Sequence, residues 1–282
     1  MLQAPQRTGL SGPTLIRLLT RLTDAEVQQS RQSLSDHLSQ WLGWTDAIAL
    51  SAALNTAPPV IAPGARMFSS AEERECVRVR TTLADAIASD TAATAAKRVA
   101  PARAPAKKLA AVLAEDEFDY SSFRQRYLSL QHTMETSIGN LRSRLRGMVA
   151  ARNGEWTRLA VVDAIMDRAL LPKERALLGA IPKLLQAHFD RLRKAEEAAL
   201  AQAAEHAVAE PGAPADAAAN VQGDTEAPAV DAAQAGTSPP APAINAGAWL
   251  DTFRADMRAV LLAELDVRLQ PVEGLLAALR TS

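Results

Sequence analysis

Aromatic residues are scarce in this chain, at 4% of its 282 residues, and cysteine occurs once, as Cys76. A single cysteine excludes an internal disulfide and is consistent with a reducing compartment. Hydrophobic residues still make up 48% of the chain. Because aromatic rings are so few, a core must be built mainly from Leu, Ala, Val, Ile and Met, which suits closely packed helices.

Long uninterrupted apolar segments are also missing. Arg17 and Arg21 interrupt the first apolar stretch, which argues against a signal peptide there. The longest early uncharged run, from Ala47 to Ala65, contains three prolines and would not cross a bilayer as a helix. The sequence therefore predicts a cytoplasmic protein without membrane insertion.

Signature motifs of catalysis and metal binding are absent from the sequence, among them GxSxG, the Walker loop and HExxH. The histidines His37, His132, His188 and His206 are far apart, and none has a neighbour at ligand spacing. His188 lies on an apolar stripe and is expected to be a hydrogen-bonded core residue, whereas His132 is expected to be solvated. We predict no catalytic residue, no metal ligand and no cofactor, and hence no enzymatic activity.

The strongest structural signal is the segment 122–152, whose apolar residues recur every three or four positions along one side of a helix. These residues are Phe123, Tyr127, Leu130, Met134, Ile138, Leu141, Leu145 and Met148. Arginines border the stripe, with Arg124, Arg142 and Arg146 along one edge and Arg126 and Arg144 along the other. A helix of this kind lies against other helices. Since no segment shows the alternation of a strand, the sequence predicts an all-α helical bundle with long amphipathic helices.

Capping residues and prolines place further helix boundaries. Capping boxes are expected at Ser33 with Asp36 and at Ser69 with Glu72. Pro172 should begin a helix, Pro182 should kink or restart it, and Pro271 should break the C-terminal helix. The segment from Trp156 to Leu171 is apolar over most of its circumference, which is typical of a helix in the middle of a bundle.

Residues 209–248 contain six prolines and five acidic residues, and they lack Lys, Arg, Leu, Phe, Trp, Tyr and Met. This composition cannot bury enough apolar surface to offset the entropy of ordering, so it predicts a disordered acidic linker. The helix that follows should dock its apolar face on the bundle. The predicted segments are 1–66 with short helices, 67–106 with a helix and a basic linker, 107–208 as the main helical hairpin or bundle, 209–248 as the linker, and 249–282 as the C-terminal helical segment.

Asp163 and Asp167 stand four residues apart and project from one helical face. Two carboxylates without a third oxygen donor make a poor metal site, so they are expected to form ion pairs with the arginine edge of the preceding helix. Seven arginines between Arg124 and Arg158 could instead neutralise phosphates. Their stems can also cover the apolar stripe, and stacking aromatics are missing, so the pattern favours packing. The candidate interaction residues are Arg124, Arg126, Arg142, Arg144, Arg146, Trp249, Phe253 and Met257.

Several blocks resemble an uncharacterised proteobacterial family catalogued as domain of unknown function 3348. They are residues 11–19, residues 34–54 with the WLGW motif at 41–44, and residues 123–148, 162–189 and 249–279. The family carries no known activity, so the resemblance transfers no catalytic residue. Its members tend to be encoded near OmpA-like and TolQ/MotA-like envelope proteins. The resemblance thus implies a cytoplasmic accessory of a cell-envelope complex, with such components as partners.

The sequence as a whole predicts a non-enzymatic, cytoplasmic helical protein that binds protein partners, or further copies of itself, through helical surfaces. The alternative is a nucleic-acid-associated protein that uses the arginine-rich helix 122–158. A third reading is an enzyme whose site forms only within a complex.

Overall fold

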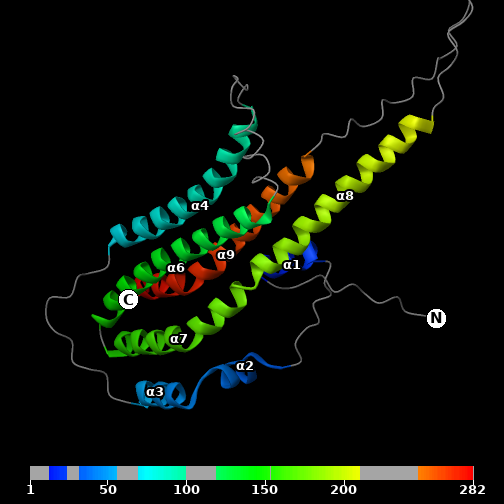
Figure 1. The fold of residues 1–282 in the computed structure, drawn as a ribbon. Coiled ribbons are helices and arrows are strands. Elements are labelled where there is room, and N and C mark those ends of the chain that lie inside the picture. Colours follow the sequence, from blue (N-terminus) through cyan, green and yellow to red (C-terminus); the bar gives the residue numbers. More distant parts are fainter. Residues whose placement is uncertain are drawn as a thin grey trace, which may run out of the picture.

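The structure is a computed structural model, and it describes residues 13–23, 32–55, 69–99, 119–152, 154–209 and 247–281 (Figure 1). Of these residues 93% are helical, and none of them forms a strand. The predicted all-α bundle is confirmed. The predicted acidic linker and most of the basic segment near residue 100 lie outside the described residues.

Helix α6 (Tyr120–Ala150) forms where the apolar stripe was expected. Six stripe residues are buried and the other two, Leu130 and Met148, are partly buried against the core. The helix begins at Tyr120, and the carboxylate of Asp119 caps its first turn by accepting a hydrogen bond from the Ser121 N–H at 3.1 Å.

Helix α9 (Ala248–Arg280) occupies the middle of the bundle, in contact with α6, α4 (Ser70–Val99), α8 (Ile181–Ala209) and α1 (Thr14–Thr23). Figure 1 shows α9 behind α6, with α4 and α8 on either side. Its buried residues recur on every turn and include Phe253, Leu261 and Leu279. The C-terminal helix therefore packs on the bundle of its own chain.

The expectation that Pro271 breaks this helix is wrong, because α9 runs through it without interruption. A proline inside a helix costs about 3 kcal/mol. Beyond Pro271, however, the helix buries Val272, Leu275 and Leu279, and each such side chain contributes about 1.5–3 kcal/mol when it leaves water. Burial outweighs the lost hydrogen bond.

Helix α7 (Gly154–Leu178) also differs from the prediction in two ways. It continues through Pro172, which lies inside the helix, and it lies at the edge of the bundle between α6 and α3 (Trp44–Asn55) rather than in its middle. The second expected interruption is confirmed. The chain turns at Gly179 and Ala180, and α8 restarts with Pro182 in its first turn.

The N-terminal helices complete the fold. The side chains of Ser33 and Asp36 form the predicted capping box of α2 (Leu34–Trp41), and Glu72 accepts from the Ser69 N–H at 2.9 Å where α4 begins. Helix α4 extends to Val99, so the first residues of the expected basic linker are helical. Helices α2 and α3 pack on α7, and Figure 1 shows them on its outer side.

Candidate functional site

A cleft of about 310 Å³ opens between α6, α7 and α9, with α2 at its edge. We call it the α7 cleft. Its apolar walls are formed by Trp41, Ile138, Leu170, Leu171, Leu177, Leu178, Val267 and Pro271. Its charged residues are Glu135, Arg142, Asp167, Lys173, Glu174 and Arg268, and Gly139 completes the lining. A mostly apolar hollow of this size with a few converging polar groups is typical of a binding site.

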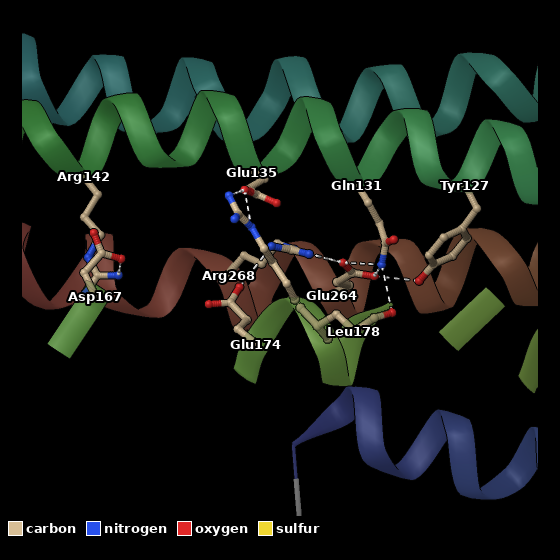
Figure 2. A network of polar contacts seen from close by, with 10 residues as sticks. Tyr127, Gln131, Glu135, Arg142, Asp167, Glu174, Leu178, Glu264 and Arg268 are labelled. Atoms are coloured by element: carbon tan, nitrogen blue, oxygen red, sulfur yellow. Dashed lines mark hydrogen bonds and ion pairs between the residues drawn. The ribbon is translucent and has the colours of Figure 1, made fainter. Parts of the chain in front are cut away.

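Behind the cleft, α6 and α9 share a buried polar network (Figure 2). The side chain of Glu264 is fully buried and accepts hydrogen bonds from the hydroxyl of Tyr127 at 2.6 Å and from the amide of Gln131 at 3.0 Å. The guanidinium of Arg268 donates to the same carboxylate at 2.9 Å. Burial, followed by the charge of Glu264 and the hydrogen bond to it, raises the pKa of Tyr127, so this hydroxyl stays protonated and acts as a donor.

The network reaches the cleft through Arg268, which also donates to Glu174 Oε1 at 3.0 Å. One guanidinium thus lies between two carboxylates, those of Glu264 and Glu174. We call these three residues the acidic triad. Burial raises the pKa of Glu174, against the opposing attraction of Arg268. Because the one positive charge of Arg268 is shared between two carboxylates, the negative charge of Glu174 is only partly compensated.

Two backbone features also shape the cleft. Pro271 has no N–H to donate to the carbonyl oxygen of Val267, and both residues line the cleft. Across from them, a Cβ added at Gly139 would meet no atom within 4 Å. Gly139 thus lines the cleft at a position that has room for a larger side chain.

The predicted ion pairs between the arginine edge of α6 and α7 are confirmed. Arg142 contacts Asp163 and Asp167 at 2.6 Å each, and Arg146 contacts the same two carboxylates at 2.7 and 2.6 Å. These four side chains are mostly buried and balance one another in charge. The carboxylates thus occupy two of the seven guanidinium groups that were candidates for phosphate contacts.

The remaining candidate interaction residues divide into two groups. Arg124 is exposed, Arg126 is half-buried and Arg144 pairs with Glu75 at 3.5 Å. Trp249, Phe253 and Met257 lie in the core, at 8%, 0% and 3% exposure. These three do not form a surface for a partner, because the bundle of their own chain covers the face that the sequence shows as apolar.

His188 is buried, and its two ring nitrogens have different partners. Nε2 lies 2.9 Å from Asp256 Oδ2, and the guanidinium of Arg191 donates to Nδ1 at 3.0 Å. A guanidinium can only donate, so Nδ1 accepts and Nε2 carries the proton that it donates to Asp256. The prediction of a hydrogen-bonded core histidine is confirmed, and His132 is exposed as expected.

Sequence reasoning missed the α7 cleft and the acidic triad. One signal was available, since Glu264 and Arg268 are spaced four apart within a segment that is otherwise strongly apolar. Charged residues at such positions are buried only when they are paired. Among the described residues, no group of three or more His, Cys, Asp or Glu side chains is arranged to hold a metal ion.

In the part of the chain that the structure describes, no helix is both long enough and apolar enough to cross a membrane. Comparison with curated proteins and with solved structures gives no match. The model of DUF3348, a family of proteins of unknown function, matches residues 1–281. This match extends over nearly the whole sequence, so the chain belongs to the DUF3348 family.

Proposed function

We propose that this chain is a non-enzymatic interaction protein that binds an amphipathic helix of a partner protein along α7, with the α7 cleft as the central pocket. The observation that carries this proposal is the mismatch between the composition of α7 and its burial. The α7 segment from Trp156 to Leu171 is apolar over most of its circumference, yet only Thr157, Ala160 and Ile165 of this segment are buried, and several of its other apolar residues are half-buried. A helix with such a sequence is typical of one covered on several sides.

Exposed apolar side chains occur along α7. Leu177, at the mouth of the cleft, is 62% exposed, and Leu159 is exposed on the same side of the helix, about five turns away. Val161 is exposed on the opposite side. The neighbouring α3 exposes Trp44 and Ile48 on one of its faces. We take these exposed apolar side chains as the surface that a partner helix would cover.

The charges around α3 also support binding of a partner at this face. Its only charged residue, Asp46, pairs with Arg168 of α7 at 3.0 Å. The carboxylate is therefore held against the neighbouring helix, and the outward face is left without charge. A partner helix could cover this face without desolvating an ionised group, which is the main cost that charged surfaces impose on binding.

A helix is the partner element that fits an apolar cleft with exposed apolar side chains beside it. Helix-in-groove recognition places apolar side chains spaced three or four residues apart into a hydrophobic groove. The cleft would take the central side chain of such a set, and the exposed residues of α7 and α3 would contact its neighbours. The family resemblance adds the proposal that the partner belongs to a cell-envelope complex and is bound in the cytoplasm.

Site-specific photo-crosslinking in native cells tests this function. We expect p-benzoylphenylalanine in place of Leu177 to crosslink to one protein, at a peptide that forms an amphipathic helix. The same group in place of Leu200, an exposed leucine of α8, is the control and should not capture that protein.

A pair of glycine substitutions shows whether the cleft itself is used. Gly139→Leu fills the cleft and should abolish the crosslink. Gly147→Leu changes a second glycine of α6 that also faces open space but does not line the cleft, and it should leave the crosslink intact. A crosslink that forms equally from position 200, or that survives Gly139→Leu, contradicts the proposal.

A further inference from the structure

The acidic triad gives the α7 cleft a chemical preference, and this inference rests on the proposed function of the cleft. Glu264, Arg268 and Glu174 together hold two carboxylates and one guanidinium. Glu264 accepts from Tyr127, Gln131 and Arg268, so its oxygens are fully engaged away from the cleft. Within the triad, Glu174 is therefore the residue that presents the excess negative charge to the cleft.

Apart from the exposed Lys173, the other charges near the cleft balance one another. Arg142 and Arg146 are matched by Asp163 and Asp167. Glu135 is matched by Arg175, whose Nε donates to it at 2.8 Å. Lys173 also lines the cleft, but it is exposed. It precedes Glu174 by one residue, so the two side chains leave the helix about 100° apart.

Hydrogen-bonding groups in the cleft show the same bias. Its guanidinium donors, on Arg142 and Arg268, already bind carboxylates. Its acceptor with the least compensated charge is the carboxylate of Glu174. A guest that fits these walls brings hydrogen-bond donors and positive charge on an apolar stem.

We propose that the α7 cleft recognises a basic side chain, lysine or arginine, on the apolar face of the partner helix, and that Glu174 is the residue that receives its charge. The stem of a lysine or arginine is a hydrocarbon chain, which the leucines of the cleft can cover while the charged head reaches Glu174. A charge-assisted hydrogen bond inside a partly desolvated cleft is stronger than one between neutral groups. A glutamate or aspartate at the same position of the partner would be rejected.

Three small probes with the same six-carbon chain test this preference in the full-length protein. They are n-hexylamine, which is protonated at neutral pH, 1-hexanol and hexanoate. Binding is followed at constant ionic strength by the NMR shift of the Trp41 indole N–H, since Trp41 lines the cleft. We expect hexylamine to bind about tenfold more tightly than hexanol, and hexanoate to bind most weakly.

Two pairs of variants locate the effect. Glu174→Gln keeps an acceptor for Arg268 but removes the charge, so hexylamine and hexanol should then bind within about twofold of each other. Glu197→Gln removes an exposed carboxylate of α8 outside the cleft, and the tenfold preference should persist. Gly139→Leu should abolish binding of all three probes, and Gly147→Leu should not.

The outcomes separate this inference from the proposed function. If hexylamine and hexanol bind the wild-type protein equally and Gly139→Leu excludes both, the cleft accepts apolar guests but the role of Glu174 is overturned. If no probe shifts the Trp41 signal, or Gly139→Leu has no effect, the cleft is not the binding pocket and the inference is overturned. The crosslinking from position 177 then decides separately whether α7 binds a partner.

Discussion

The side-chain amide of Gln131 on α6 donates a hydrogen bond of 3.1 Å to the backbone carbonyl oxygen of Leu178, the last residue of α7. In an uninterrupted helix this carbonyl would accept from the N–H of residue 182. Pro182 has no N–H, so the turn between α7 and α8 leaves the carbonyl without its usual donor. Gln131 supplies the donor from another helix, and it links this turn to Glu264 in the centre of the bundle.

A double-mutant cycle tests whether the Gln131 amide takes the place of the backbone N–H that Pro182 lacks. We expect Gln131→Leu to lower the free energy of unfolding by about 1–3 kcal/mol, because it leaves the Leu178 carbonyl without this donor and removes one of the three donors to Glu264. In a Pro182→Ala background the cost should be smaller by about 0.5–1.5 kcal/mol, since the new N–H can serve Leu178. Urea denaturation of the four proteins measures both values. Equal costs in the two backgrounds would show that the carbonyl does not depend on Gln131.

The apolar stripe of α6 provides a simpler test of the core. Leu141 is 4% exposed, and truncating such a leucine to alanine typically costs about 2–5 kcal/mol. We expect Leu141→Ala to lower the thermal midpoint clearly, while His132→Ala, on the exposed side of the same helix, leaves it unchanged. A neutral Leu141→Ala would place the stripe at an interface and not in a core.

Removing one member of the acidic triad should be more damaging than removing a pair. Glu264→Leu leaves the buried guanidinium of Arg268 with Glu174 alone, and breaking a buried ion pair in this way costs about 3–5 kcal/mol. The double variant Glu264→Leu/Arg268→Met should recover most of that loss, because neither charge then remains buried. Chemical denaturation compares the two. A double variant that is less stable than the single one rules out this account of the network.

The stability of the protein should depend on pH through Glu174. Burial raises its pKa above the ordinary 4.5, so the protonated carboxyl is favoured more in the folded state than in the unfolded state. This contribution to stability is fully present below pH 4.5 and is lost as the pH rises through the higher folded-state pKa. Between about pH 4 and pH 7, the wild-type protein should lose stability relative to Glu174→Gln. Thermal midpoints across that range provide the measurement, with Glu197→Gln as the control; parallel curves for wild type and Glu174→Gln would contradict the expected shift.

Binding to nucleic acid should be weak. If arginines of α6 contacted about five phosphates, the logarithm of the affinity would fall with the logarithm of salt concentration at a slope near −4 to −5. Because Arg142 and Arg146 are occupied by carboxylates, we expect no complex with DNA or RNA tighter than about micromolar at physiological salt. Fluorescence anisotropy tests this directly. A submicromolar, steeply salt-dependent complex that is lost in Arg124→Ala would favour the nucleic-acid alternative.

Local patterns in the sequence were sufficient for some features and insufficient for others. The three- and four-residue spacing of Phe123 to Met148 predicts the buried face of α6, because burial and helical geometry act on the same residues. The spacing of Asp163 and Asp167 likewise predicts their ion pairs, because carboxylates on one helix attract the arginines of the helix that faces them. Both predictions depend on one helix and its immediate neighbour.

The predictions fail where the result depends on how distant parts of the chain pack against one another. Pro271 interrupts an isolated helix, but in α9 the buried residues on both sides keep the helix continuous. The composition of α7 indicates a central helix, yet α9 takes that place because its apolar residues recur on more sides. The α7 cleft combines residues from α2, α6, α7 and α9, and no local pattern determines how those helices are placed relative to one another.

The central position of α9 has a consequence for how the protein is made. This helix follows all the other described helices along the chain, yet it covers the apolar faces of α1, α4, α6 and α8. During synthesis those faces leave the ribosome before the helix that covers them. The growing chain therefore exposes much of its future core until α9 has emerged, a state that favours aggregation and calls for chaperones. A stop codon shortly before residue 248 would leave every earlier helix intact and still remove the element around which they assemble.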